Sequence, residues 1–213
     1  MDRHDRRRRD HWCGRFPRGR QGAVSRLDEL IATFAEKFRP REDGTRLPSH
    51  HANCLGCGED NPHGHRLEVR RAGQGVVAEH TFDHRHEGAP GIAHGGALAT
   101  VVDDLYGFLQ YLVGGPAVTR RLEIEYLRPV LLDVPYRLEA HLTGRKERRL
   151  EVEASIADPE GQIVLTSTAV FVLVDVGHFA TAYARTQENT STSAITDTAA
   201  EAGDPGTVPW PQP

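Results

Sequence analysis

The sequence predicts an α+β fold in which a single antiparallel sheet wraps around one long helix. Two observations support this prediction. From about residue 120 to residue 174, apolar and polar side chains alternate, which is typical of strands with one buried face. Ahead of that region lies the longest helical pattern of the chain, in which apolar residues recur every three to four positions. One sheet curled around this helix buries the apolar faces of both.

The predicted elements follow in the order of two strands, one helix and four strands. The first two strands, over residues 67–70 and 76–82, are joined by a turn at residues 73–75. The helix runs from about Gly95 to Val113 and is ended by the Gly-Gly-Pro sequence that follows. The last four strands cover residues 122–126, 136–142, 150–156 and 163–174.

The predicted helix carries a carboxylate on a face of small residues. Its apolar stripe consists of Leu98, Val101, Val102, Leu105, Leu109 and Leu112, and its second stripe of Gly96, Ala99, Asp103, Gly107 and Gln110. Gly95 and Gly96 leave the first backbone N–H groups of the helix unobstructed, so an oxyanion or a polarised carbonyl can approach them. Asp104 points in another direction, which favours Asp103 as the functional acid.

The composition excludes several classes of protein. The net charge of −4 and the pI near 6.3 give the chain no general attraction for nucleic acid or anionic membranes. No apolar run is long enough to span a membrane. Three cysteines are too few to staple a secreted fold of 213 residues, so we expect a cytoplasmic protein.

The composition also divides the chain into segments. We predict a disordered Arg-rich head over residues 1–21, an amphipathic helix and linker over residues 22–49, the folded domain over residues 50–176, and a disordered polar tail over residues 177–213. The amphipathic helix would place its aromatic face on the domain or on a partner chain.

Cys54 and Cys57 form a Cys-x-x-Cys pair, which is half of a zinc site. Candidates for the remaining ligands are His51, His63 and His65. The alternative is a turn-rich entry to the first strand with two small thiols beneath it, and this is the interpretation that we adopt. A second loop contains His84, His86 and Glu87, which could be a ligand cluster or, as is usual for histidines in loops, solvated side chains.

Three motifs together resemble one family. His94-Gly95-Gly96 is followed by Asp103 nine residues after the histidine. Cys-x-x-Cys-Gly followed by Asn61-Pro62-x-Gly64, and Tyr126-Leu127-Arg128-Pro129, are further matches. Over about residues 50–176 the chain resembles the PaaI-like acyl-CoA thioesterases of the hotdog superfamily. The resemblance implies a hotdog fold, hydrolysis of an acyl-CoA to free acid and CoA, and no metal or redox cofactor.

The resemblance also implies roles for particular residues. The backbone N–H of Gly96 would polarise the thioester carbonyl, Asp103 would act as general base or nucleophile, and Thr119 would assist it. His94 and Gly95 would contact the substrate, although His94 could instead only orient the turn. Some relatives carry an Asn or Gln where this chain has residues 87–90, so the second oxyanion contact is unassigned.

The spacing of Gly96 and Asp103 predicts a dimer. Seven residues separate them by about 10 Å along a helix, so one helix cannot place both groups at one carbonyl. The simplest source of the acid is Asp103 of a second chain in a homodimer or a dimer of dimers. Thr119 shares strand parity with the polar residues Arg121 and Glu123, so it faces the helix only if the strand bulges there.

Two alternative functions belong to other classes of protein. A non-catalytic acyl-CoA-binding module would keep the glycine turn but would not need Asp103. A hotdog hydratase would require an Asp/His pair on other loops, and no such pattern is present. Candidates for acyl-chain contacts are Tyr106, Phe108 and Tyr111, although aromatic residues at helical spacing are more often core. Candidates for CoA-phosphate contacts are Arg120, Arg121 and Arg128.

Overall fold

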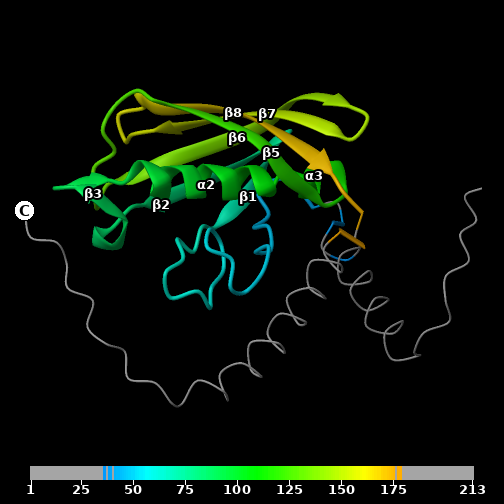
Figure 1. The fold of residues 1–213 in the computed structure, drawn as a ribbon, viewed down its shortest axis with the longest axis horizontal. Helices are drawn as coiled ribbons and strands as arrows, with labels where there is room; N and C mark the ends of the chain where they lie inside the picture. Colours follow the sequence, from blue (N-terminus) through cyan, green and yellow to red (C-terminus); the bar gives the residue numbers. More distant parts are fainter. Residues whose placement is uncertain (1–35, 37, 40, 176, 179–213) are drawn as a thin grey trace, which may run out of the picture.

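A six-stranded antiparallel sheet packs against the helix α2 (Figure 1). The computed structural model describes residues 36, 38–39, 41–175 and 177–178. The strands of this sheet are β1 (Val69–Ala72), β2 (Gly75–Thr81), β5 (Ala117–Tyr126), β6 (Pro135–Lys146), β7 (Arg149–Ala157) and β8 (Ile163–Leu173), in the order β1-β2-β6-β7-β8-β5. A small second sheet of β3 (Glu87–Ala89) and β4 (Ile92–Ala93) follows the short helix η1 (His84–His86).

Alternation of side chains along the strands builds the core face of the sheet. In β6 and β7 every second residue is buried over most of the strand, and Leu138 pairs with Ile156 while Ala140 pairs with Ala154. Because successive side chains point to opposite faces, the intervening Arg and Glu residues face solvent. The predicted strands and their order after the helix are confirmed, and so is the α+β hotdog architecture.

The predicted helix from Gly95 to Val113 is divided in two. α2 covers Gly95–Gly107 and α3 covers Gln110–Val113. Between them the backbone N–H of Phe108 donates to the carbonyl of Leu105, three residues back, and the turn tightens. Phe108 and Leu109 are both 1% exposed. The tight turn follows Gly107, a weak helix former, and α3 ends at Gly114, whose φ of 76° is left-handed.

A second layer of chain lies on the side of α2 away from the sheet (Figure 1). The segment from Thr45 to Leu47 runs beside β1, with Leu47 N–H donating to the carbonyl of Val69 at 2.8 Å. Residues 50–65 form a series of turns beneath the helix. α2 is therefore covered on both sides, and residues 41–49 belong to this packing although their composition is that of a linker.

Several predicted segments lie outside the described residues. These are the Arg-rich head, the polar tail beyond residue 178, and all but a few residues of the N-terminal amphipathic helix. Within the described part of the chain, every helix is too short or too polar to cross a bilayer.

Truncating the core at Leu138 tests the packing of the sheet on α2. Leu138 is fully buried, so Leu138→Ala should lower the free energy of unfolding by about 2–5 kcal/mol. Leu131 is 50% exposed, so Leu131→Ala should change that free energy by only about 0.5 kcal/mol. Urea unfolding of both variants measures the difference, and equal effects would contradict the assignment of Leu138 to the core.

Candidate active site

The N-terminus of α2 is capped by the histidine before the two glycines. His94 has extended backbone angles, and its Nδ1 accepts a hydrogen bond from the Gly96 N–H at 2.8 Å. This satisfies one of the backbone donors that a helix N-terminus leaves open. Of the two predicted roles for His94, the structure therefore displays the orienting one, and the Gly96 N–H is held by the cap.

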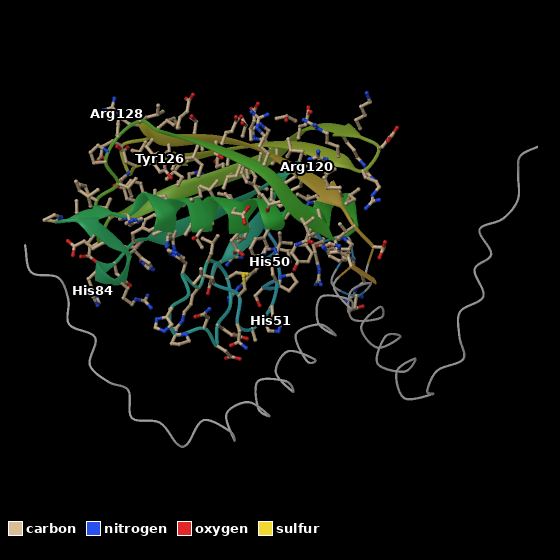
Figure 2. The ribbon with its side chains drawn as sticks, in the orientation of Figure 1. His50, His51, His84, Arg120, Tyr126 and Arg128 are labelled. Carbon is tan, nitrogen blue, oxygen red and sulfur yellow. The ribbon has the colours of Figure 1, made fainter. Side chains whose placement is uncertain are left out.

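A cavity of about 570 Å³ opens beside this helix terminus. Its lining residues are Ile92, Ala93, Gly95, Gly96, Leu98, Tyr126, Leu127, Arg128, Pro129 and Val130. The Tyr126 hydroxyl donates to the carbonyl of Gly95 at 2.9 Å and ties the end of β5 to the start of α2. Figure 2 shows Tyr126 and Arg128 together at this end of the molecule, while Arg120 lies toward the other end of β5. The cavity thus joins backbone donors, apolar walls and one guanidinium group.

Asp103 lies two turns along the same helix and meets Thr119 of β5. The Thr119 hydroxyl donates to Asp103 Oδ1 at 2.7 Å. The pairing of β5 with β8 shifts register between Thr119 and Arg121, which is the irregularity that turns Thr119 toward the helix. The structure brings Asp103 and Thr119 together, and it leaves Gly96 of the same chain seven residues away.

Asp104 faces a different part of the molecule from Asp103, as predicted. Its Oδ1 lies 3.0 Å from His50 Nδ1 and 3.2 Å from Cys54 Sγ, and its side chain is 7% exposed. Burial raises the pKa of this carboxyl, while the hydrogen bond from His50 acts in the opposite direction. Asp104 is therefore enclosed by the Cys-x-x-Cys loop and does not reach the cavity at the helix N-terminus.

His50 is the histidine that meets the two cysteines, and the sequence reasoning missed it. The predicted partners His51 and His63 are exposed, and His65 lies in another cluster. His50 Nδ1 lies 3.3 Å from Cys57 Sγ. The sequence does contain the spacing His50-x₃-Cys54-x₂-Cys57, which could have indicated His50 as the partner of the cysteines in place of His51.

A stack of three buried histidines lies beside β2. His65 and His86 stack with their ring centroids 4.1 Å apart, and His65 Nδ1 lies 3.3 Å from His80 Nε2. Burial, with the neighbouring histidine charges, lowers the pKa of His65 to about 3 and that of His80 to about 4. His86 was predicted to be solvated or a ligand, but it is buried and caps η1 by accepting from the Asp83 N–H.

The strand that carries Thr119 lies at the edge of the sheet. β5 pairs with β8 on one side, and within the described residues no strand pairs with its other side. Arg121 forms an ion pair with Glu123 on its exposed face. A ten-residue edge strand presents unpaired backbone donors and acceptors, which makes it available to another chain.

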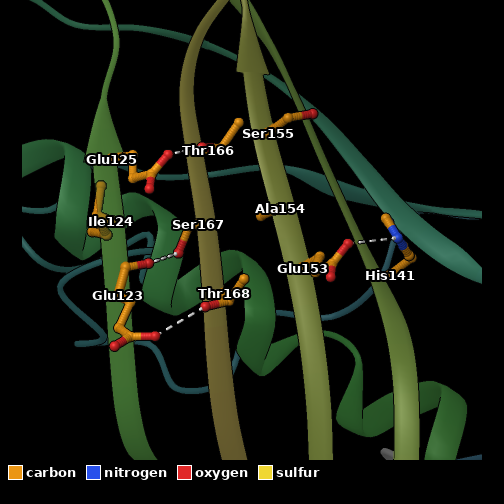
Figure 3. Close-up of a pocket in the computed structure, with 10 residues that line it drawn as sticks. All are labelled: Glu123, Ile124, Glu125, His141, Glu153, Ala154, Ser155, Thr166, Ser167 and Thr168. Carbon is orange, nitrogen blue, oxygen red and sulfur yellow. Dashed lines mark hydrogen bonds and ion pairs between the residues drawn. The ribbon is translucent and has the colours of Figure 1, made fainter.

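A second depression, of about 760 Å³, lies over the sheet and is acidic (Figure 3). Its lining includes Glu123, Glu125 and Glu153, and His141 Nε2 lies 3.8 Å from Glu153 Oε2. Thr168 and Ser167 donate hydrogen bonds to Glu123. These carboxylates repel an anionic ligand, and the depression contains none of the predicted site residues.

Comparison with known proteins agrees with this fold. The family model described as "Thioesterase superfamily" matches residues 90–165. The chain is 31% identical over 164 residues to acyl-coenzyme A thioesterase THEM4 of Rattus norvegicus, covering 76% of this chain and 69% of the rat protein. The protein of the same name from Mus musculus is 32% identical over 90 residues, which is 42% of this chain and 39% of the mouse protein.

A solved structure shows the same fold. Protein RHA08564, a thioesterase superfamily protein, aligns with a TM-score of 0.55 and 22% identity over 74% of this chain and 81% of that one. The fold is thus that of the hotdog proteins. The chain belongs to the thioesterase superfamily and is a thioester hydrolase, which confirms the resemblance found in the sequence.

The histidine stack predicts a pH dependence of stability. The unfolded chain takes up protons near the ordinary histidine pKa of 6.5, whereas His65 and His80 stay neutral in the folded state down to about pH 3–4. The free energy of unfolding should therefore have its full value above pH 6.5. Below pH 6.5 it should fall by up to about 1.4 kcal/mol per pH unit for each histidine.

Urea titrations between pH 7 and pH 4.5 measure this slope. His80→Gln should flatten it, whereas His63→Gln, at an exposed histidine, should leave it unchanged. An identical slope in all three proteins would show that the stack does not cause the acid sensitivity.

Proposed function

We propose that this protein hydrolyses an acyl-CoA thioester to a free acid and CoA. The observation that carries the proposal is the hydrogen bond from Thr119 of β5 to Asp103 of α2, the helix whose N-terminus opens into a largely apolar cavity. Its relatives in rat and mouse are named acyl-coenzyme A thioesterases. A thioester carbonyl is already electrophilic, so an oriented water, a base and backbone donors suffice for its hydrolysis.

The carbonyl oxygen of the substrate would bind at the N-terminus of α2. There the Gly96 N–H would donate to the carbonyl oxygen, either in place of its hydrogen bond to His94 Nδ1 or in addition to it. Gly95 lines the cavity and His94 directly precedes Gly95 in the chain, so both would contact the acyl-thioester segment. The positive end of the helix dipole stabilises the negative charge that develops on this oxygen in the transition state.

Asp103 would act as general base on water. Its carboxylate takes a proton from the water as the water oxygen forms a bond with the thioester carbon. The C–S bond then breaks, and the CoA thiolate leaves and takes the proton back from Asp103, which restores the carboxylate. The Thr119 hydroxyl, 2.7 Å from Asp103 Oδ1, orients the carboxylate so that the second oxygen faces the water.

The acid and the donor of one site would come from two subunits of a homodimer. Gly96 and Asp103 of one chain are separated by about 10 Å along α2. The open edge of β5 gives a two-fold partner a place to extend the sheet, and Thr119 lies on that strand. Pairing there brings the Asp103 side of one helix toward the cavity of the other chain.

The CoA phosphates would bind near Arg128, since Arg120 lies toward the other end of β5 (Figure 2). Arg128 lines the cavity beside the helix N-terminus. Arg121 is a weaker candidate because its guanidinium already pairs with Glu123. A non-catalytic acyl-CoA-binding module is not favoured, since the chain belongs to a family of hydrolases and keeps an oriented carboxylate.

Replacing the base tests the reaction. Asp103→Asn keeps an oxygen that accepts from Thr119 but removes the basic carboxylate, so kcat should fall by about 10²–10⁴. Thiol release from a panel of acyl-CoAs measures kcat, and isothermal titration with CoA should give unchanged binding. Glu139→Gln, at an exposed acid of β6, is the matched control. Turnover equal to wild type in Asp103→Asn would refute the role of Asp103, and no turnover by wild type would favour the binding module.

Subunit complementation tests the shared site. Gly96→Pro removes the N–H within the first helical turn, where proline is tolerated, and should be inactive, as should Asp103→Asn. Refolding the two variants together should restore about one quarter of wild-type activity, because half of the dimers are mixed and each contains one intact site. Circular dichroism and size-exclusion chromatography check the folding of each variant. Absence of rescue in dimers shown to be mixed would place both groups in one subunit.

A further inference from the structure

Four metal-binding side chains converge beneath α2 at a place that the proposed reaction does not use. They are His50, Cys54, Cys57 and Asp104, and their donor atoms lie within 4.8 Å of one another. Asp104 Oδ1 lies 3.0 Å from His50 Nδ1, 3.2 Å from Cys54 Sγ and 3.5 Å from Cys57 Sγ. Figure 2 shows His50 and the sulfur atoms together below the helix, far along it from Tyr126 and Arg128.

The surrounding backbone is shaped to fit these side chains. A Cβ on Gly56 would lie 2.1 Å from Asp104 Cγ, and a Cβ on Gly107 would lie 2.7 Å from His50 Cε1, so only glycine permits either approach. The backbone N–H of His50 donates to Cys57 Sγ at 3.2 Å. Such N–H donors stabilise a thiolate more than a thiol. The loop therefore holds the four donors in place through both its glycines and its amides.

The cluster places a carboxylate and two sulfur atoms where little solvent reaches them. The side chains of Asp104 and His50 are 7% and 18% exposed, and Cys57 is buried. Asp104 Oδ2 is buried and has no hydrogen-bond partner among the described residues. A buried carboxylate oxygen without a partner is costly unless a cation compensates it.

We propose that His50, Cys54, Cys57 and Asp104 bind one Zn²⁺ ion in a closed tetrahedral site. Zinc is bound in proteins by Cys thiolates, His nitrogens and Asp or Glu oxygens, and bond lengths of about 2.0–2.3 Å place neighbouring ligand atoms roughly 3.3–3.8 Å apart in a tetrahedron. Four of the six separations between donor atoms are 3.0–3.5 Å and the other two are within 4.8 Å, so modest shifts of the side chains would meet that geometry. Zinc requires both cysteines as thiolates and His50 as a neutral imidazole, so binding would release into solvent the protons that these groups hold.

The ion would have a structural role. Residues 50–65 contain turns but no strand or long helix, so few backbone hydrogen bonds hold this segment to the rest of the chain. Four protein ligands leave no open position for water, which is typical of structural and not catalytic zinc. Because Asp104 is the neighbour of Asp103, the ion would fix the helical turn that carries the proposed base without touching the substrate.

Metal analysis of the full-length protein tests the proposal. Protein purified without chelators or metal-affinity resin should contain about one zinc per chain by mass spectrometry of the elements. Cys54→Ser/Cys57→Ser and His50→Asn should each reduce this to below roughly one tenth. Two controls should retain full zinc, His51→Asn at the adjacent exposed histidine and Cys13→Ser at the remaining cysteine. Equal zinc in the ligand variants and the controls would overturn the assignment.

A test on the unmodified protein guards against variants that fail to fold. After removal of zinc with a chelator, Co²⁺ should bind at one equivalent and give the visible and thiolate charge-transfer absorption of a tetrahedral site, and Zn²⁺ should displace it. Chelator alone should lower the melting temperature and expose two thiols to a thiol reagent. A wild-type protein with no bound metal and no cobalt spectrum, or with a Cys54–Cys57 disulfide in the intact mass, would refute the zinc site.

Discussion

Burial of α2 on two sides constrains nearly everything else in this molecule. One side of the helix packs against the six-stranded sheet, and the other is covered by the turns of residues 50–65. The surface that remains open includes the N-terminus and the side that carries Asp103. The polar groups of the proposed chemistry, Gly96 and Asp103, lie on this remaining surface. The packing that stabilises the domain therefore also determines where its reactive groups can be reached.

The two neighbouring carboxylates on this helix have different surroundings. Asp103 accepts from a hydroxyl on an edge strand, at a surface open to another chain. Asp104 is enclosed with an imidazole and two thiols. The rotation between successive helical residues is sufficient to separate them. Two acids that look equivalent in the sequence are thus candidates for unrelated tasks, one for proton transfer and one for holding the loop to the helix.

The sequence predicted the sheet and the helix because both have strong periodicity, and their amphipathic faces have one compact arrangement. It did not predict the break after Gly107, since apolar residues continue at helical spacing through Leu112 while the backbone tightens locally. The sequence could place Thr119 toward the helix only on the condition that the strand bulges there. A bulge changes the face to which a side chain points, and the residue types do not reveal it. His50 was missed because His51 beside it has the same chemistry, and tertiary contact alone distinguishes them.

The helical register of α2 has a consequence for how this protein can vary. A substitution on the helix changes one contact, whereas a single inserted residue between Gly96 and Asp103 would rotate both carboxylates by about 100° and advance them by about 1.5 Å. Asp103 would leave Thr119, and Asp104 would leave the thiols, in one step. The length of this segment should therefore be far less tolerant of change than its composition, and natural length variation should fall in the loops at either end.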